Sequence, residues 1–346
     1  MANINDVARR AGVSTTTVSH VVNATRFVRE ATRLRVEAAV RELGYVPSGV
    51  ARSLKQNTTL TFGMLLPNNS NPYFAEVLRG LEERCYAAGY NIILGNSNDD
   101  AGRQAHYLRV LAEKRIDGLV LVTSREVGLR EAGLREVLGE LNIPVVLLDR
   151  EIPGLACDLV EVDHVTGGLI ATRHLLELGH RHVACISGPA GLSPSSQRRA
   201  GWKQALAEAG VAREEGDLAR GDFSARSGYQ AMQTLLGRPS RPSAVFVCND
   251  LMAFGALAAA YEAGIPVPGA LSIVGYDDIE LAAYSSPPLT TVAQPKRQIG
   301  ALAAELLLAR VGGRGGPPRR EVLEPRLKVR SSTAPLRSGR PLRGNS

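Results

Sequence analysis

Cysteine and long apolar runs are scarce in this chain of 346 residues. Its cysteines lie far apart, so none forms the closely spaced pair of a zinc or redox motif, and we expect them to be small core residues. No run approaches the roughly 18 uninterrupted apolar residues of a membrane span, and the N-terminus is polar. The sequence therefore predicts a cytoplasmic protein with no secretion signal and no membrane partner. The cysteines are Cys85, Cys157, Cys185 and Cys248.

Motifs of the common enzyme classes are missing as well. The chain has no Walker phosphate-binding sequence, no GxSxG nucleophile elbow and no HExxH metal motif. Asp149 and Asp277 could act as an acid–base pair, but two carboxylates could equally orient the hydroxyl groups of a bound molecule. We therefore expect a protein that is not an enzyme and uses no metal and no cofactor. A sugar-active enzyme is the remote alternative.

Charge is distributed unevenly along the chain. The formal net charge is +7, within a composition that is typical of globular proteins. Residues 1–60 carry a balance of +5 and residues 311–346 a balance of +7, whereas the segment between them is acidic at −5. A polyanion should therefore meet one end of the chain. The Arg-, Gly- and Pro-rich stretch from Val311 onward is more typical of a solvated, partly disordered tail, which favours the N-terminal end.

The first sixty residues predict three short helices. Asn5 or Asp6 can cap the first helix, and Gly12 can end it because glycine tolerates positive φ. Ser14 opens the second helix, and residues 30–43 form the third. Such a unit could be a generic small helical bundle. It could also be a DNA-binding unit. The side chains on the surface of the second helix distinguish the two interpretations.

The second helix has an apolar face and a polar face. Val18, Val21 and Val22 recur at helical spacing and can pack inward. The remaining side chains are short and polar, so they could enter the major groove of DNA and hydrogen-bond to base edges. These side chains are Thr16, Ser19, His20 and Asn23.

From Thr59 onward, short β-branched or Leu-rich runs alternate with longer amphipathic stretches, which is the pattern of doubly wound parallel sheets. Two half-size sheets, over about 60–160 and 161–290, predict two lobes with a cleft between them. The segment from Leu289 to Arg310 is expected to return to the first lobe. We predict eight strands. The first four, assigned to the first lobe, span 61–67, 91–97, 117–123 and 143–150. The other four, assigned to the second lobe, span 158–163, 182–189, 243–250 and 271–278.

The residues that follow these strands are unusually polar. Ligands of open α/β sheets collect beyond the carboxyl ends of the strands, so these residues are candidates for a binding site. Carboxylates, guanidinium groups and amides can make paired hydrogen bonds to hydroxyls, and aromatic rings can stack on a ring face, which together favour a sugar. Helix capping or core packing is the alternative for each residue alone. The candidates are Asn71, Tyr73, Phe74, Asp149, Arg150, Arg198, Phe223, Asn249, Asp277 and Gln294.

The N-terminal segment also resembles a known family. Residues 4–55 are similar to the helix-turn-helix headpiece of the lactose-repressor family, and residues 14–28 (STTTVSHVVNATRFV) resemble its purine-type and ribose-type members. The resemblance implies that the second helix reads base edges, and that a short hinge helix packs in the minor groove and drives Leu54 between base pairs. The implied DNA contacts are Thr15, Thr16, Ser19, His20, Asn23 and Arg26 in the headpiece, and Val50, Ala51, Leu54 and Lys55 in the hinge.

The core resembles the periplasmic ribose-binding relatives of this family at all ten candidate positions. The motifs NPYF, VVLLDR, GDF, FVCND, VGYDD and TVAQP, together with the helix that carries Arg198, bring residues of the ribose-contacting type to these positions. The resemblance implies ribose as the small-molecule effector. Purine-type members use an arginine against the base where this chain has Leu192, which puts purine binding in doubt. Another pentose, a hexose or a purine is the alternative effector.

The resemblance also implies the order of domains and the mode of action. A small all-α headpiece over 1–46 and a hinge helix over 47–58 precede a two-lobed α/β core over 59–330, like that of periplasmic binding proteins, and a flexible basic tail over 331–346. We expect a repressor that binds palindromic double-stranded DNA as a homodimer, since no C-terminal leucine heptad is present. A transport-type receptor would need a secretion signal. The lobe boundaries are 59–160 with 291–330 for the first, and 161–290 for the second.

Overall fold

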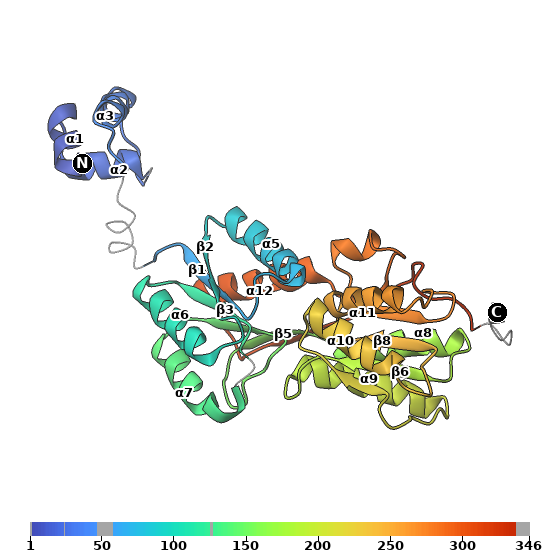
Figure 1. Cartoon of the computed structure of the whole chain (residues 1–346). Coiled ribbons are helices and arrows are strands. Elements are labelled where there is room, and N and C mark those ends of the chain that lie inside the picture. The colour runs from blue at the N-terminus through green and yellow to red at the C-terminus, as the bar shows by residue number, and fades with distance from the viewer. Residues whose placement is uncertain (1, 24, 47–57, 125–126, 337–346) are drawn as a thin grey trace. The chain divides into compact units, whose positions relative to one another are not determined.

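The computed structural model describes residues 2–23, 25–46, 58–124 and 127–336. The chain forms two compact units, which meet in sequence between Thr59 and Leu60 (Figure 1). The predicted hinge contacts Val50, Ala51, Leu54 and Lys55 lie outside the described residues. Within the described part of the chain, no helix is long and apolar enough to cross a membrane.

The N-terminal unit contains three helices around a small apolar core. Asn3, rather than Asn5 or Asp6, caps the first helix, because its side chain accepts the Asp6 N–H while the Asp6 carboxylate accepts the Asn3 N–H. Gly12 ends this helix at φ 64°, and Ser14 caps the second, as predicted. The core includes Val7, Val18 and Val36. The helices are α1 (Ile4–Ala11), α2 (Thr15–Val22) and α3 (Glu30–Glu42).

The first lobe of the larger unit is built on a six-stranded sheet with the order β11-β5-β4-β3-β1-β2. All its neighbouring strands run parallel. The strands are β1 (Thr61–Leu66), β2 (Asn91–Asn96), β3 (Gly118–Leu121), β4 (Val145–Leu148), β5 (Asp158–Val162) and β11 (Arg320–Leu323). The helices are α5 (Pro72–Ala87), α6 (Ala101–Glu113), α7 (Val127–Glu140) and α12 (Lys296–Val311).

Alternating residues of β1 bury two faces of this sheet. Phe62, Met64 and Leu66 pack with α5 and α12, whereas Leu65 packs with α6 and α7. Such two-sided burial explains why the strands appear in the sequence as continuous apolar runs. It also leaves the polar residues to the ends of the strands.

The second lobe repeats this architecture. Its six-stranded sheet has the order β12-β10-β9-β8-β6-β7, in which only β12 runs antiparallel to its neighbour. The strands are β6 (Val183–Ser187), β7 (Leu218–Arg220), β8 (Ala244–Val247), β9 (Ser272–Asp277), β10 (Thr290–Ala293) and β12 (Arg326–Lys328). The helices are α8 (His164–Glu177), α9 (Ser193–Glu208), α10 (Ala225–Leu236) and α11 (Asp250–Glu262), with a 3-10 turn η1 (Glu280–Ala283).

The structure corrects the predicted lobe boundaries in two places. Strand β5, which we assigned to the second lobe, pairs with β4 and β11 in the first. Strands β10 and β12, which we expected in the first lobe, pair with each other in the second, where β10 also pairs with β9, whereas α12 and β11 do return to the first lobe. The chain therefore crosses between the lobes three times, after β5, after β10 and between β11 and β12. Short edge strands explain the error, because β11 and β12 carry few apolar residues and have no clear strand signal.

The C-terminal stretch is part of the second lobe up to residue 336, which corrects the predicted tail over 331–346. Ser332 is fully buried between β9 and β10: its backbone carbonyl accepts the Ile273 N–H at 2.9 Å, and its Oγ accepts the Thr290 N–H at 2.8 Å. Further on, the Leu336 N–H donates to the carbonyl of Leu178. Since basic composition dominates this stretch, the sequence did not reveal the small polar residues that dock it.

Candidate functional site

The predicted DNA-reading side chains lie on and directly after α2. Thr16 and Arg26 are exposed, whereas Thr15, Ser19, His20 and Asn23 are half-buried. Two of them make local contacts: the Asn23 amide donates to the Ser19 carbonyl at 2.9 Å, and His20 Nδ1 lies 2.8 Å from the Thr25 hydroxyl. Thr16 and Arg26 are therefore the members of this set most open to a partner. Val18, which belongs to the same helix, is fully buried in the core of the N-terminal unit.

A cleft of about 640 Å³, part of it open to solvent, lies between the two lobes of the core. Nine of the ten predicted ligand contacts line it, from both sheets, so the structure brings together residues that are up to about 200 positions apart. The residues of the first lobe are Asn71, Tyr73, Phe74, Asp149 and Arg150, and those of the second are Arg198, Phe223, Asn249 and Asp277.

Gln294 is the one candidate that does not line the cleft. Its amide donates to Asp277 Oδ1 at 2.7 Å, and it is 4% exposed. Gln294 therefore acts behind the cleft wall, as a support for Asp277. The sequence reasoning missed several lining residues that also follow strands or helix starts, namely Pro67, Asn68, Asp99, Val122, Pro194 and Asp222, while Leu192 lines the cleft as well.

Helix capping and cleft lining occur together at two asparagines. Asn71 caps α5 by accepting the Tyr73 N–H at 3.0 Å, with Pro72 in the first turn, and this places Tyr73 and Phe74 at the cleft. Asn249 caps α11 and also donates to the Phe223 carbonyl at 3.0 Å. The capping role that we kept as an alternative for such residues is therefore compatible with a place in the cleft wall.

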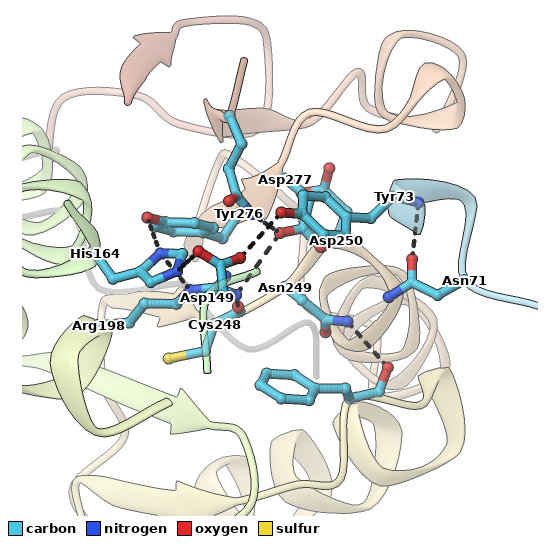
Figure 2. A network of polar contacts seen from close by, with 12 residues as sticks. Asn71, Tyr73, Asp149, His164, Arg198, Cys248, Asn249, Asp250, Tyr276 and Asp277 are labelled. Atoms are coloured by element: carbon cyan, nitrogen blue, oxygen red, sulfur yellow. Dashed lines mark hydrogen bonds and ion pairs between the residues drawn. The ribbon is translucent and has the colours of Figure 1, made fainter. Parts of the chain in front are cut away.

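The Asp149 carboxylate lies at the centre of the polar network in Figure 2. Its oxygens accept the Val162 N–H and the Tyr73 hydroxyl, each at 3.1 Å, and Oδ1 lies 3.3 Å from Nε2 of His164. Burial alone would raise the pKa of the Asp149 carboxyl, but His164 and Arg198 bring it below its usual value. Asp149 is therefore an ionised acceptor at neutral pH.

Arg198 supplies the cationic side of the network. Its guanidinium stacks on the Tyr276 ring at 3.9 Å, and its Nη1 donates to the Cys248 carbonyl at 2.6 Å. The same nitrogen lies 3.6 Å from Asp277 Oδ1. A guanidinium held on these sides is fixed in orientation, so its remaining donors can face a ligand in the cleft.

Asp277 closes the network on the second lobe. Burial raises the pKa of its carboxyl to about 6, although Arg198 and the hydrogen bond from Gln294 act in the opposite direction. Lys296, at the start of α12, donates to the Asp277 backbone carbonyl at 2.7 Å. The first-lobe helix α12 thereby holds the end of strand β9 in the second lobe.

Arg150 closes the first-lobe side of the cleft. Its guanidinium lies 3.0 Å from Asp99 Oδ1 and also donates to the Thr123 carbonyl. The whole cleft thus presents paired charges with fixed geometry together with three aromatic side chains, Tyr73, Phe74 and Phe223. This combination can bind a small polar molecule that has several hydroxyls and a ring face.

His164 and Tyr276 are two network residues that the sequence reasoning missed. His164 is the first residue of α8, whose cap is Asp163, and its Nδ1 lies 2.9 Å from the Tyr276 hydroxyl. Tyr276 precedes Asp277 in the motif that we used, but it points to the back of the site rather than lining it. The rule that polar residues gather at strand ends could have found His164, because it follows β5 by two positions.

Two family descriptions match the chain. The description "Bacterial regulatory proteins, lacI family" matches residues 3–48, and "Periplasmic binding protein-like domain" matches residues 172–333. These ranges cover the N-terminal unit and most of the second lobe. The helical unit and the two-sheet core therefore each have a counterpart among known proteins.

The relatives and solved structures align with most of this chain. The HTH-type transcriptional repressor PurR of Photobacterium profundum is 44% identical, with 97% of this chain and 100% of the relative aligned. The ribose operon repressor of Escherichia coli K12 is 43% identical over 90% of this chain and 93% of the relative.

Two solved structures extend the comparison to the fold. The lac repressor dimer bound to operator and the anti-inducer ONPF has a TM-score of 0.86 at 29% identity, covering 96% of this chain and 99% of that one. A LacI family regulator from Enterococcus faecalis V583 with bound ribose has a TM-score of 0.72 at 34% identity, covering 80% and 100%. With its helix-turn-helix headpiece and periplasmic-binding-protein-like core, the chain belongs to the lacI family of bacterial regulatory proteins, which are DNA-binding transcriptional repressors.

Proposed function

We propose that this repressor binds ribose in the interlobe cleft and that the bound sugar changes its affinity for operator DNA. The observation that carries the proposal is that one cleft gathers nine side chains of the ribose-contacting type. Its carboxylates, Asp149 and Asp277, can accept hydrogen bonds from sugar hydroxyls, and Arg198 and Arg150 can donate to the sugar oxygens. Phe74 and Phe223 offer apolar faces for the ring.

Overall similarity does not decide between a sugar and a purine, since PurR is 44% and the ribose operon repressor 43% identical to this chain. The cleft itself favours the sugar. Leu192 is buried and lines the cleft where purine-type members have an arginine, so the donor for a purine base is missing at this position. The ribose bound to the Enterococcus faecalis regulator also supports the proposal.

Calorimetric titration of the full chain tests the effector. Ribose is expected to bind, whereas purine bases bind more weakly or not at all because Leu192 cannot hydrogen-bond to them. Xylose and arabinose, which differ from ribose in the configuration of single hydroxyls, serve as matched controls. Tight binding of a purine and none of the pentoses would reassign the cleft, and turnover of the bound sugar would support an enzyme instead.

Effector affinity should fall in mild acid. Because the pKa of the Asp277 carboxyl is about 6, protonation below that pH removes an ionised acceptor from the cleft, and affinity approaches a tenfold loss per pH unit. The stability of the fold should change in the opposite direction. Burial raises the pKa of this carboxyl from its usual 3.8 to about 6, so its contribution to the free energy of unfolding increases as the pH drops from about 6 to 3.8. Titrations between pH 5 and pH 8, on the parent and on Asp277→Asn, check this. The variant should bind weakly at every pH, and an equally steep profile in the variant would assign the effect to another group.

We further propose that the protein binds palindromic DNA as a homodimer, with one headpiece on each half-site. The lac repressor structure is a dimer on its operator, which supports this arrangement. Thr15, Thr16, Ser19, His20, Asn23 and Arg26 are the proposed headpiece contacts. If ribose changes operator affinity by some factor, operator DNA must change ribose affinity by the same factor. Equilibrium titrations in both directions measure the two factors.

The hinge supplies a separate prediction, which rests on the sequence. Leu54→Ala should weaken binding to a specific operator by about tenfold or more while leaving non-specific, salt-dependent binding unchanged, because only the wedge between base pairs is lost. Lys55→Ala is the matched control, since removing a positive charge from a DNA-binding segment should weaken both kinds of binding. Fluorescence anisotropy with operator and scrambled duplexes, at two salt concentrations, separates the two effects.

A further inference from the structure

His164 lies between the two lobes without lining the cleft. It begins α8, which packs on the second lobe, and its side chain is 1% exposed. On one side, its Nε2 faces the first-lobe carboxylate of Asp149 at 3.3 Å. On the other side, its Nδ1 faces the second-lobe groups of Tyr276 and Arg198 (Figure 2). The imidazole therefore joins the anionic and the cationic halves of the network.

The partners of His164 determine where its proton lies. The Arg198 Nε–H can only donate, and it points to Nδ1 at 3.4 Å, while the Tyr276 hydroxyl lies 2.9 Å from the same nitrogen. Nδ1 must therefore be the acceptor. Burial and the positive charge of Arg198 lower the pKa of the imidazole, which keeps it neutral, so its single proton is on Nε2 and faces Asp149.

This arrangement fixes Asp149 from two lobes at once. Tyr73 and Val162 donate hydrogen bonds to its carboxylate from the first lobe, and His164 Nε2 faces it from the second at 3.3 Å without meeting hydrogen-bond geometry. Arg198 is fixed in turn by Tyr276 and by the Cys248 carbonyl. A ligand that contacts both Asp149 and Arg198 therefore depends on the spacing between these two side chains. The imidazole of His164, which contacts both of them, helps to hold that spacing.

We propose that His164 is a positioning residue of the effector site, whose Nε2–H orients Asp149 while its Nδ1 accepts from Tyr276 and Arg198. Its role rests on the proposed function of the cleft, because it acts through two proposed effector contacts. Replacing it should lower effector affinity without removing any group that touches the effector.

Two substitutions test the role by loss and rescue. His164→Leu removes both nitrogens and should lower ribose affinity by about tenfold or more, because the polar contact of Nε2 with the Asp149 carboxylate at 3.3 Å is lost together with the two contacts of Nδ1. His164→Gln places an amide N–H near the position of Nε2–H and should restore affinity to within about threefold of the parent. Calorimetry on the full-length chain measures both. Equal affinity in the leucine variant and the parent, or no difference between the two variants, would overturn the proposal.

His180 provides the matched control. It is also a buried histidine of the second lobe, 3% exposed, with its ring nitrogens near Ser243, Ser272 and the Ala334 carbonyl, and it does not line the cleft. His180→Leu should lower the unfolding midpoint in urea but leave ribose affinity unchanged. If both leucine variants lose affinity in proportion to their loss of stability, His164 has only a structural role.

The protonation state can be measured without any ligand. In protein labelled with ¹⁵N-histidine, the ring signals that disappear in His164→Gln should be those of a neutral imidazole protonated on Nε2. A proton on Nδ1, or a charged imidazolium at neutral pH, would contradict the proposed orientation. If the parent binds none of the pentoses or purines, the proposed function fails, while this measurement still decides how His164 is oriented.

Discussion

Arg198→Met is expected to abolish measurable ribose binding, a loss of at least about a hundredfold, and to destabilise the core by about 3–5 kcal/mol. The guanidinium is 5% exposed and lies near the carboxylate of Asp277, so its removal leaves buried negative charge without compensation. Without Arg198, the pKa of the Asp277 carboxyl should rise further above 6, and this group should take up a proton near neutral pH. Calorimetry and urea unfolding measure the two losses.

A second substitution keeps this test valid if the methionine variant does not fold. Arg198→Lys retains the charge but not the planar group that stacks on Tyr276, so it should fold and bind ribose at least about tenfold more weakly. Arg173→Met is the control, because Arg173 pairs with Glu208 on the exposed surface, where water screens the charges and an ion pair contributes little to stability. Full ribose affinity in Arg198→Lys would show that charge alone is required.

Gly300→Ala is expected to destabilise the first lobe by about 3 kcal/mol. A Cβ at Gly300 would lie 1.9 Å from the Val77 carbonyl oxygen, and one at Gly80 would lie 2.0 Å from that of Arg297. These contacts are with backbone, so α5 and α12 would have to separate. Helix α5 begins at the cleft, where Asn71 caps it, and α12 begins at Lys296, which donates to the Asp277 carbonyl, so ribose affinity should fall as well.

Gly139→Ala is the matched control for this prediction. Gly139 lies in helix α7 with no atom within 4 Å of a Cβ, so the same substitution should be neutral or stabilise the fold by up to about 1 kcal/mol, as expected from helix propensity. Urea unfolding of the two variants gives the comparison. A Gly300→Ala variant as stable as the parent would mean that the two helices can move apart at little cost.

The central strands were predictable from the sequence because both of their faces are buried. Phe62 and Leu65 in β1 point to opposite helix layers, and this leaves an apolar run without gaps. The cleft residues were predictable for a related reason: once strands are placed, their carboxyl ends define where polar residues can meet. Asp149 and Asp277 both follow this rule.

Pairing across the lobes was not predictable from the sequence. β5 ends at Val162 in one lobe, and His164 begins a helix of the other, so no local pattern indicates that His164 faces back towards Asp149. The edge strands β7, β11 and β12 are three or four residues long, too short for an apolar period to appear. Ser332 also looks like part of a polar tail until its two buried neighbours are known.

The three passages of the chain between the lobes lie next to one another. Val162 is opposite Leu323 in the first sheet, and Ala293 is opposite Arg326 in the second, so each passage starts beside another. A single connection would leave the relative orientation of the lobes to one segment of chain, whereas three adjacent connections share that role and restrict rotation of one lobe against the other.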